Sequence, residues 1–450
     1  MSLPGYSTYK ASGTAVIGAV PHHWEMKPIK AVASINDDVL AEATDPMFEL
    51  AYVDIGSVSL DTGIEKTEAY TFKDAPSRAR RLVQNGDVIV STVRTYLKAI
   101  AAIIEPPENL VVSTGFAVVR PLNSIVPGFA KYALQSLSFI DEVISRSTGI
   151  SYPAINATDL GRIFLPVPPL DEQFVIAAFL NRETVKIDAL IAEQEKLLVL
   201  LAEKRQATIS HAVTRGLNAE PMKESGVAWL GKVPAHWEVV GLTKYLESVV
   251  DYRGRTPTKV DDGVFLITAK NIRNGVIDYE ASQEYIDRAE YDDVMRRGLP
   301  LKGDVLFTTE APLGQVAIVD REDIALAQRI IKFRAAPDRL DSAYLKMWIM
   351  GSACQFNLEQ LATGSTALGI KGSKVGQVRL CLPPLDEQRE IVRHIIAETS
   401  KLDTLKAEAE QAIELLKERR SALITAAVTG KINVSGSIAP LTKNGEELAA

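Results

Sequence analysis

The chain has 450 residues, of which 46% are hydrophobic and 24% are charged, and its formal net charge is −7 at pH 7. This length is too great for one ordinary hydrophobic core and predicts two or more globular domains. The two cysteines, Cys354 and Cys381, exclude a disulfide framework and a four-cysteine zinc site. No apolar run reaches the roughly 18–20 residues that a membrane span needs, so we expect a cytoplasmic protein with no membrane partner.

The charge is spread evenly, because acidic side chains outnumber basic ones in each of the four main segments described below. Nucleic-acid-binding domains usually carry a basic face, since neutralising phosphates supplies much of their affinity. Bulk composition therefore does not indicate DNA, and a DNA-binding interpretation needs local support.

Residues 1–170 predict a mixed α/β domain. Short apolar runs between turn residues are typical of strands, and helical spacing follows over Phe129–Leu137. The expected strands are Asp87–Val90, Ala99–Ile104, Leu110–Val112, Phe116–Arg120 and, after a loop around Gly149–Pro153, Ile163–Val167.

Residues 171–219 predict a long helix that begins after Pro168-Pro169-Leu170-Asp171-Glu172-Gln173. The prolines stop the preceding strand, and the acidic residues suit the positive end of a helix dipole. Apolar positions then alternate by three and four, which is the seam period of a coiled coil. A single amphipathic core helix is the alternative, and Arg205 and Arg420 are expected at the edge of the helix pair. The predicted packing residues are Ile187, Leu190, Leu197, Leu201, Leu402, Leu405, Leu416 and Leu423.

Residues 220–385 repeat the plan of the first domain, 386–430 repeat the helix, and 431–450 read as a flexible tail. Strands are expected at Val264–Thr268, Asp304–Phe307, Gln315–Val319, Ile324–Leu326 and Ile330–Arg334, followed by one helix near Ala343–Phe356.

The two halves share motifs at nearly constant spacing. Pro383-Pro384-Leu385-Asp386-Glu387-Gln388 repeats the earlier six residues at an offset of 215, and His23-Trp24-Glu25 returns as His236-Trp237-Glu238. Gly86-Asp87-Val88 likewise returns as Gly303-Asp304-Val305. Anchors held over such a distance indicate duplicated domains. The long helices carry matching seams, and the economical packing is one against the other.

Catalytic patterns are missing. The stretch Gly226–Lys232 has the spacing of a phosphate loop, but Val233 stands where that motif needs a Ser or Thr hydroxyl. The five histidines are scattered, so we predict no metal site. Packing of Trp229 and Trp237 is the better explanation of the glycine-rich stretch, and we predict a chain that is not an enzyme.

Loops in both domains carry donors of the kind that contact phosphates and base edges, although a solvated surface is the alternative at each position. The candidate DNA-binding residues are Arg94, Tyr96, Lys98, Arg146 and Tyr152 in the first domain, and Arg253, Arg255, Lys270, Asn271, Arg273, Asn274, Thr309, Glu310, Ser365, Thr366, Lys371 and Lys374 in the second.

Taken together, these motifs resemble the specificity subunit of type I restriction–modification enzymes. The resemblance rests on the doubled Pro-Pro-Leu-Asp-Glu-Gln helix start, on Trp229-Leu230-Gly231 with Val233-Pro234-Ala235-His236-Trp237-Glu238, on Gly303-Asp304-Val305-Leu306 and on Gly364-Ser365-Thr366. The first copy departs from the pattern, with Val16-Ile17-Gly18 in place of Trp-Leu-Gly and Gly149-Ile150-Ser151 in place of Gly-Ser-Thr.

The resemblance implies a fold of two mixed α/β target recognition domains joined by two long antiparallel coiled-coil helices. Each domain would read one half of a split double-stranded DNA sequence, and the helices would fix the spacer between the halves. It also implies two methyltransferase subunits that modify adenine, restriction and translocase subunits, and S-adenosylmethionine, ATP and magnesium in those partners, with no cofactor in this chain. A non-enzymatic coiled-coil scaffold whose α/β domains bind peptides is the alternative function.

Overall fold

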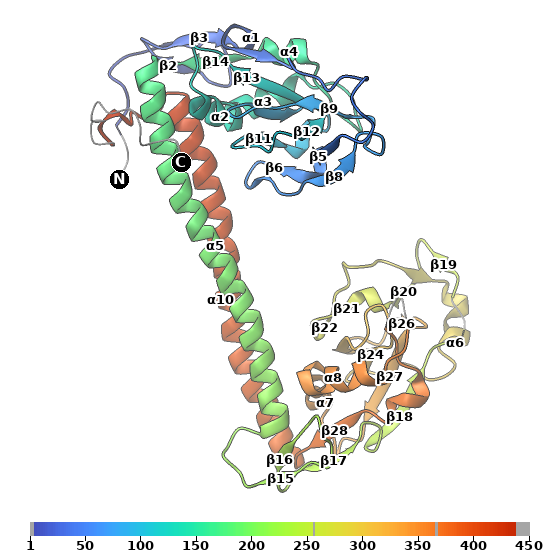
Figure 1. The fold of residues 1–450 in the computed structure, drawn as a ribbon. Helices are drawn as coiled ribbons and strands as arrows, with labels where there is room; N and C mark the ends of the chain where they lie inside the picture. The colour runs from blue at the N-terminus through green and yellow to red at the C-terminus, as the bar shows by residue number, and fades with distance from the viewer. Residues whose placement is uncertain (1–3, 255–256, 365–367, 438–450) are drawn as a thin grey trace. The chain divides into compact units, whose positions relative to one another are not determined.

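The computed structural model describes residues 4–254, 257–364 and 368–437, which fold into two compact units (Figure 1). Unit 1 combines the chain up to Glu195 with the chain from Gln411 onward, and unit 2 is Lys196–Glu410. Two long helices, α5 (Leu170–Arg215) and α10 (Leu385–Val428), each contribute one part to each unit.

Over the described residues, unit 1 is a mixed α/β domain built on two four-stranded sheets, with three smaller two-stranded sheets (Figure 1). Its helices are α1 (Ile29–Val32), α2 (Pro127–Gln135), α3 (Leu137–Arg146), α4 (Ala157–Gly161) and the 3-10 turns η1 (Ile55–Ser57), η2 (Thr95–Leu97) and η5 (Ser435–Ser437). Its strands are β1 (Tyr9–Ala11), β2 (Ala19–Pro21), β3 (Glu25–Pro28), β4 (Ala33–Ile35), β5 (Glu49–Val53), β6 (Val58–Ser59), β7 (Gly63–Ile64), β8 (Glu68–Thr71), β9 (Ala79–Leu82), β10 (Val88–Ser91), β11 (Ile100–Ala102), β12 (Leu110–Ser113), β13 (Phe116–Pro121) and β14 (Phe164–Val167).

Unit 2 has a similar succession of elements. Its helices are α6 (Tyr291–Val294), α7 (Ser342–Met350), α8 (Ser352–Leu361), α9 (Gly372–Val375) and the turns η3 (Ala269–Asn271) and η4 (Arg288–Glu290). Its strands are β15 (Met222–Glu224), β16 (Lys232–Pro234), β17 (Glu238–Gly241), β18 (Leu246–Asp251), β19 (Lys259–Val260), β20 (Val264–Ile267), β21 (Ile272–Arg273), β22 (Val276–Ile277), β23 (Tyr285–Ile286), β24 (Val305–Thr308), β25 (Val316–Ile318), β26 (Ile324–Leu326), β27 (Ile330–Ala335) and β28 (Arg379–Leu382).

The two four-stranded sheets of unit 1 have counterparts in unit 2, and most of their strands correspond. The four-stranded order β11-β10-β13-β4 of unit 1 matches β25-β24-β27-β18 of unit 2. In the second sheet of each unit, the parallel pair β5 and β12 matches the parallel pair β20 and β26. Unit 1 adds β9 beside β12, whereas β23 of unit 2 carries β19 on its outer side. The predicted fold of duplicated mixed α/β domains joined by two long helices is therefore confirmed.

One predicted helix is wrong. The sequence predicted a single helix near Ala343–Phe356, but α7 ends and α8 begins around Gly351, whose backbone is extended. The break brings the start of α8 against α5, where the Ser352 amide donates to the Ser210 hydroxyl at 2.9 Å. Unit 1 has the same break at Ser136, after which the Leu137 amide donates to the Thr425 hydroxyl of α10 at 3.0 Å. A tertiary contact thus divides an apolar run that local spacing reads as one helix.

The repeated six residues join each long helix to its α/β domain. Glu172 accepts hydrogen bonds from Trp24 Nε1 at 3.1 Å and from the hydroxyl of Tyr6, and it contacts His23 Nε2 at 2.9 Å. Gln173, which is buried, accepts from the Val126 amide at 2.7 Å. These contacts satisfy buried polar groups at the point where the helix leaves the domain core.

Unit 2 makes the same connections with the second copy. Glu387 accepts from Trp237 Nε1 at 3.0 Å and contacts His236 Nε2 at 2.8 Å. Gln388 accepts from the Asp341 amide at 2.9 Å and donates to the Pro383 carbonyl. In each unit, the Pro-Pro-Leu-Asp-Glu-Gln motif and the His-Trp-Glu motif therefore contact each other and connect the long helix to the α/β domain.

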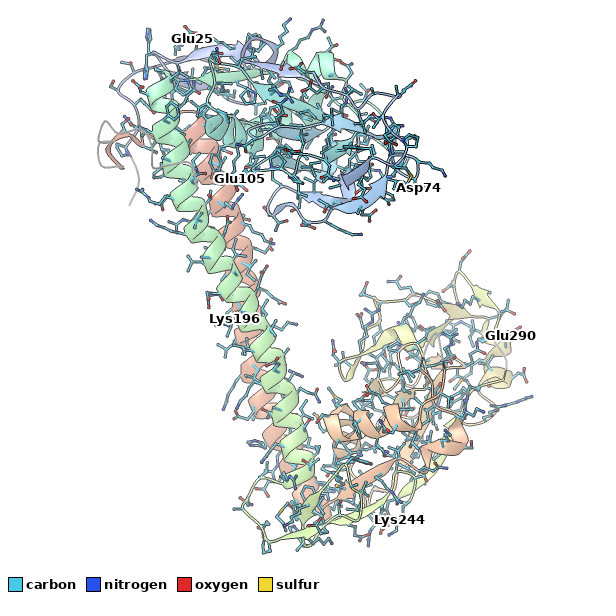
Figure 2. All side chains as sticks on the ribbon, in the orientation of Figure 1. Glu25, Asp74, Glu105, Lys196, Lys244 and Glu290 are labelled. Carbon is cyan, nitrogen blue, oxygen red and sulfur yellow. The ribbon has the colours of Figure 1, made fainter. Side chains whose placement is uncertain are left out.

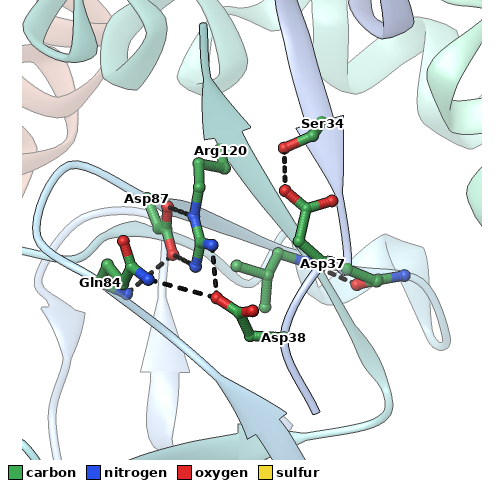
Figure 3. Close-up of polar contacts among 8 residues, drawn as sticks. Ser34, Asp37, Asp38, Gln84, Asp87 and Arg120 are labelled. Atoms are coloured by element: carbon green, nitrogen blue, oxygen red, sulfur yellow. Dashed lines mark hydrogen bonds and ion pairs between the residues drawn. The ribbon is translucent and has the colours of Figure 1, made fainter.

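The repeated Gly-Asp-Val motif supplies a buried carboxylate to each core sheet. In unit 1, Asp87 accepts two hydrogen bonds of 2.9 Å from the guanidinium of Arg120, which also pairs with Asp38 (Figure 3). In unit 2, Asp304 accepts two bonds of 2.8 Å from Arg334 and lies 3.3 Å from the buried ammonium of Lys332. The sheet of unit 2 thus buries one more charge than the sheet of unit 1.

The two long helices run antiparallel and are tied by reciprocal ion pairs. In unit 1, Arg420 of α10 donates to Asp188 of α5 at 2.9 Å. In unit 2, Arg205 of α5 pairs with Asp403 of α10. Because Asp403 and Arg420 are the counterparts of Asp188 and Arg205 at the offset of 215, the two contacts are the same contact made with the helices exchanged. The sequence analysis expected both arginines at the edge of the helix pair without naming a partner, and the structure gives each of them an aspartate of the other helix.

The apolar seam of the helix pair keeps the predicted alternation of three- and four-residue steps, but some of the residues predicted to lie on it are exposed. Ile187 and Leu201 are buried, and Leu402, Leu416 and Leu423 are half-buried. Leu190, Leu197 and Leu405 are instead 53%, 38% and 46% exposed, so their assignment to the packed seam is wrong. On α5 the half-buried positions are the next residues, Ile191 and Leu198. A coiled-coil seam alternates steps of three and four residues, and from Ile187 either step can come first. The sequence pattern placed the step of three residues first, whereas the structure has the step of four residues first.

We expect exchange of the charges at one ion pair to be tolerated only when both partners change. Arg420→Asp should lower the free energy of unfolding by about 1–2 kcal/mol, because two carboxylates would then face each other on partly buried helices. Asp188→Arg combined with Arg420→Asp should restore most of the loss, as measured by urea unfolding in a double-mutant cycle. Additive losses would show that the pair does not couple the helices.

The long helices carry many charged side chains, such as Lys196, which projects from the surface of α5 (Figure 2). Among the helices of the described residues, none combines the length and the apolar character needed to cross a membrane.

Candidate nucleic-acid interface

Equivalent loops gather at one edge of the second sheet in each unit. Because β5 and β12 are parallel, Asp54 after β5 and Ser113 at the end of β12 lie at the same edge. In unit 2, Thr268 after β20 and Ala327 after β26 take these places. Residues that follow neighbouring parallel strands are a common location for ligand contacts.

A second loop closes over this edge in both units. The backbones of Thr148 and Ala154 exchange hydrogen bonds of 2.9 Å, and Ala154 also bridges Val93 in the loop after β10. In unit 2, Thr363 and Gly369 exchange bonds of 2.9 and 3.0 Å, and Gly369 bridges Glu310 after β24. The loops after the Gly-Asp strand and after the second short helix are therefore neighbours in each unit.

This arrangement brings several predicted residues of unit 1 together. The guanidinium of Arg94 lies 5.0 Å from the centre of the Tyr152 ring, which is 64% exposed. Tyr96 is 52% exposed in the turn that follows Arg94, and Lys98 is exposed at its end. Arg146 lies at the end of α3, where it pairs with Glu142 at 3.0 Å.

In unit 2, charged residues among those predicted to bind DNA are paired with side chains of opposite charge. Arg253 pairs with Asp251, and Glu310 pairs with Arg329 at 2.9 Å. The segment that holds Lys371 passes close to Arg253, since a Cβ on Gly372 would lie 2.5 Å from Arg253 Nη2.

A separate exposed turn of unit 2 holds three further predicted residues. Lys270 and Arg273 are linked by a bond of 3.0 Å from Arg273 Nε to the Lys270 carbonyl. Asn274 follows in the left-handed region with φ 50°, and its amide donates to Gln315 Oε1 at 3.2 Å.

Two predicted contacts are wrong because the side chains are buried in the protein. Asn271 is fully buried, where it accepts from the Thr268 amide and donates to the carbonyls of Asp278 and Ser282. Thr309 is 2% exposed and donates to the Arg329 carbonyl. Both residue types satisfy backbone groups in turns as readily as they contact DNA, and the sequence could not separate these roles.

Lys374 is half-buried and donates to the Leu361 carbonyl at 3.0 Å, so its ammonium is already engaged. Arg255, Ser365 and Thr366 lie outside the described residues.

The sequence analysis did not identify the charged residues that strand pairing places beside these loops. Asp54 and Arg78 join Arg94 and Tyr152 around one recess of unit 1, and Arg329 joins Glu310 in unit 2. The apolar run Leu50–Val53 before Asp54 was an available signal for a strand end. Nothing local to Arg78 indicates that it meets the loop of Arg94.

Groups that could act as nucleophiles or metal ligands are placed elsewhere. Cys354 and Cys381 are buried, and burial raises the pKa of the Cys381 thiol to about 12, so that it stays protonated. Within residues 4–254, 257–364 and 368–437, no group of three or more His, Cys, Asp or Glu side chains has an arrangement that would hold a metal ion. The stretch Gly226–Lys232 leads into strand β16 and not into a helix, and the Trp229 ring lies 6.2 Å from that of Phe356.

Comparison with known proteins gives a consistent result. The family described as Type I restriction modification DNA specificity domain matches residues 23–198 and again residues 244–415. A putative type I restriction enzyme specificity subunit of Methanocaldococcus jannaschii, MjaX, is 24% identical over 433 residues, covering 93% of this chain and 96% of that protein. The EcoKI specificity subunit of Escherichia coli is 23% identical over 331 residues, which are 70% of this chain and 68% of that protein.

A solved structure has the same fold. It comes from a study of complex assembly and conformational transition of the type I R-M system, and it superposes with a TM-score of 0.65 at 23% identity, covering 91% of this chain and 99% of that chain. With two matches to one family model, which together span most of its length, the chain belongs to the type I restriction–modification specificity family and is a DNA-specificity subunit with two recognition domains.

Proposed function

We propose that each unit reads one half of a split double-stranded DNA sequence and that the antiparallel helix pair fixes the spacer between the halves. The observation that carries this proposal is the reciprocal contact of the helices, in which Asp188–Arg420 and Arg205–Asp403 repeat each other at one offset. Each long helix thus makes the same contact once in each unit, and duplicated recognition domains suit a split sequence with two half-sites.

The different chemistry at equivalent loops supports separate specificities for the two halves. Where unit 1 has Asp54 and Arg94, unit 2 has Thr268 and Ala311 at the corresponding strand ends. The sheets beneath are alike, so the scaffold is shared while the contact residues differ. A duplicated scaffold with divergent loops is what reading two different half-sites requires.

The chemical steps are proposed to belong to partner subunits. Two methyltransferase subunits would modify adenine with S-adenosylmethionine, and restriction and translocase subunits would use ATP and magnesium, while this chain supplies recognition without catalysis. The acidic balance of the chain, −7 overall, suits an assembly in which partners share the phosphate contacts.

Methylome mapping tests this function directly. Cells that express the chain with its methylating partner should show adenine methylation at one split sequence, and cells without the chain should lose it. Replacing unit 1 by that of a relative should change one half of the sequence only. Binding of the assembled complex to that DNA should also weaken steeply with salt. A change in both halves, or a response to salt that is flat, would instead favour the peptide-binding scaffold.

A further inference from the structure

A polar recess of about 400 Å³ lies at the loop edge of unit 1, between the parallel strands and the closing loop. Exposed side chains of Asp54, Arg78, Arg94 and Tyr152 surround it, and its floor includes Ser113, which is 1% exposed. Gly115 keeps this floor closely packed, since a Cβ there would approach Ile55 Cδ1 to 2.6 Å. The recess is thus bounded by charged side chains at its rim and by closely packed residues at its base.

The two guanidinium groups at the rim have no carboxylate partner. Throughout the described part of the chain, no Asp or Glu lies within ion-pair distance of the Arg78 or Arg94 side chain. Arg120, Arg146 and Arg162 of the same unit are paired, and Arg80 packs on the Phe72 ring instead. Two guanidinium groups that line one recess without an ion pair leave their N–H donors available to a ligand with acceptor atoms.

The backbone holds one of these arginines in an unfavourable conformation. Arg94 has φ 52°, in the left-handed region that side chains other than glycine, asparagine and aspartate rarely adopt. The conformation is maintained by hydrogen bonds from the Leu97 amide to the Arg94 carbonyl and from Thr95 Oγ1 to Ser147 Oγ, both at 2.8 Å. The corresponding Ala311 of unit 2 has φ 49°, so this turn conformation belongs to the scaffold that both units share, and in unit 1 it places an arginine there.

The carboxylate of Asp54 narrows the choice of ligand. If the rim bound only phosphate, the negative charge of Asp54 beside the two arginines would repel that ligand. In the major groove, a G·C pair presents the N7 and O6 acceptors of guanine next to the N4 amino donor of cytosine. Arginine pairs with the two acceptors, and aspartate accepts from the amino group. No other base pair offers this order of groups.

We infer that the recess rim of unit 1 reads a G·C base pair, with Arg78 or Arg94 donating to guanine and Asp54 accepting from the cytosine amino group. Tyr152 supports this contact by holding Arg94 against its ring, 5.0 Å from the ring centre. The inference rests on the proposed function and deepens it, because it assigns one position of the half-site read by unit 1. The corresponding edge of unit 2 carries Thr268 and the Glu310–Arg329 pair, so the same reading is not expected there.

The test uses the full chain assembled with its methylating partner. Duplexes are selected from a random library, and the selected sequences are compared for the wild type, Arg78→Ala, Arg94→Asn and Asp54→Asn. Asparagine is chosen at position 94 because it tolerates a positive φ. Lys98→Asn is the matched control, since Lys98 is exposed, has the same φ of 52° and lies outside the rim.

The wild type should select a split sequence with an invariant G·C pair in one half. At least one arginine variant should accept all four base pairs at that position, with a loss of roughly 5- to 150-fold on the original site. Asp54→Asn should weaken discrimination at the same position. Replacing that guanine by 7-deazaguanine, which lacks the N7 acceptor, should weaken the wild type and not the responsible arginine variant. Lys98→Asn should weaken binding to all sequences about equally.

Two outcomes would overturn the inference. If the wild type selects a split sequence but neither arginine variant relaxes a G·C position, the inference fails and the proposed function stands. If the wild type itself selects no split sequence, the proposed function fails and the inference falls with it.

Discussion

Replacing Asp304 by alanine is expected to destabilise unit 2 by about 3–5 kcal/mol, because removing one partner of a buried ion pair leaves the other charge uncompensated. Lys332 is 1% exposed, and among the described residues its ammonium would then keep one polar partner, the Leu299 carbonyl at 2.9 Å. The guanidinium of Arg334 would lose both of its bonds to the carboxylate. Urea unfolding of the full chain measures the loss.

The matched variant in unit 1 should cost less. Asp87 has the same place, but its Arg120 keeps a second carboxylate in Asp38 (Figure 3). Val118 also takes the strand position at which unit 2 buries Lys332. Asp304→Ala combined with Lys332→Val should therefore recover part of the loss. Equal effects of Asp87→Ala and Asp304→Ala would show that the buried lysine contributes nothing to the difference.

The Asp304 carboxylate also makes the stability of unit 2 depend on pH. Burial opposes ionisation of Asp304, but hydrogen bonds from Arg334 and the Leu301 amide outweigh it and hold its pKa below the usual value. A carboxylate with a lowered folded-state pKa stabilises the fold above its unfolded pKa of about 3.9, and this stabilisation is lost as the pH falls through the folded pKa. The Asp304→Ala variant should lack this component of acid sensitivity.

Lengthening both long helices by one matched heptad is expected to increase the recognised DNA spacer by about three base pairs. Seven residues inserted after Glu195 in α5 and seven after Glu410 in α10 preserve the seam period and leave both reciprocal ion pairs able to form. Each insertion adds about 10.5 Å of helix, and DNA rises by about 3.4 Å per base pair. Selection of bound duplexes by the assembled complex gives the spacer length.

The control is an insertion into α5 alone. Asp188–Arg420 and Arg205–Asp403 could then not be made together without a distortion, since the same number of residues separates the two contacts on each helix of the native chain. That variant should unfold at a lower temperature than the doubly lengthened chain. An unchanged spacer in the doubly lengthened chain would show that the helix pair does not set the distance between half-sites.

The repeated motifs have a structural explanation in this protein. Trp24 and Trp237 are fully buried, and each donates to the glutamate at the start of a long helix. Asp87 and Asp304 hold arginines of the neighbouring strand. These residues, which the two copies share, therefore build the scaffold, and the residues in the loops at the ends of the parallel strands differ between the copies.

The sequence by itself determined the duplication, the positions of the two long helices and most core strands, because these depend on local signals. Prolines stop a strand, acidic residues start a helix, and apolar periodicity distinguishes helices from strands. These signals are contained within a few turns of chain, so they can be read without knowing what packs against them.

Only the tertiary structure decided which polar side chains face the solvent and which satisfy the protein itself. Asn271 and Arg273 lie two residues apart in the sequence, yet the first is buried in a turn and the second is exposed. Arg78 meets the loop of Arg94 because strands distant in the sequence pair side by side. Hydrogen bonding and ion pairing depend on positions in space, and side-chain chemistry alone does not specify a partner.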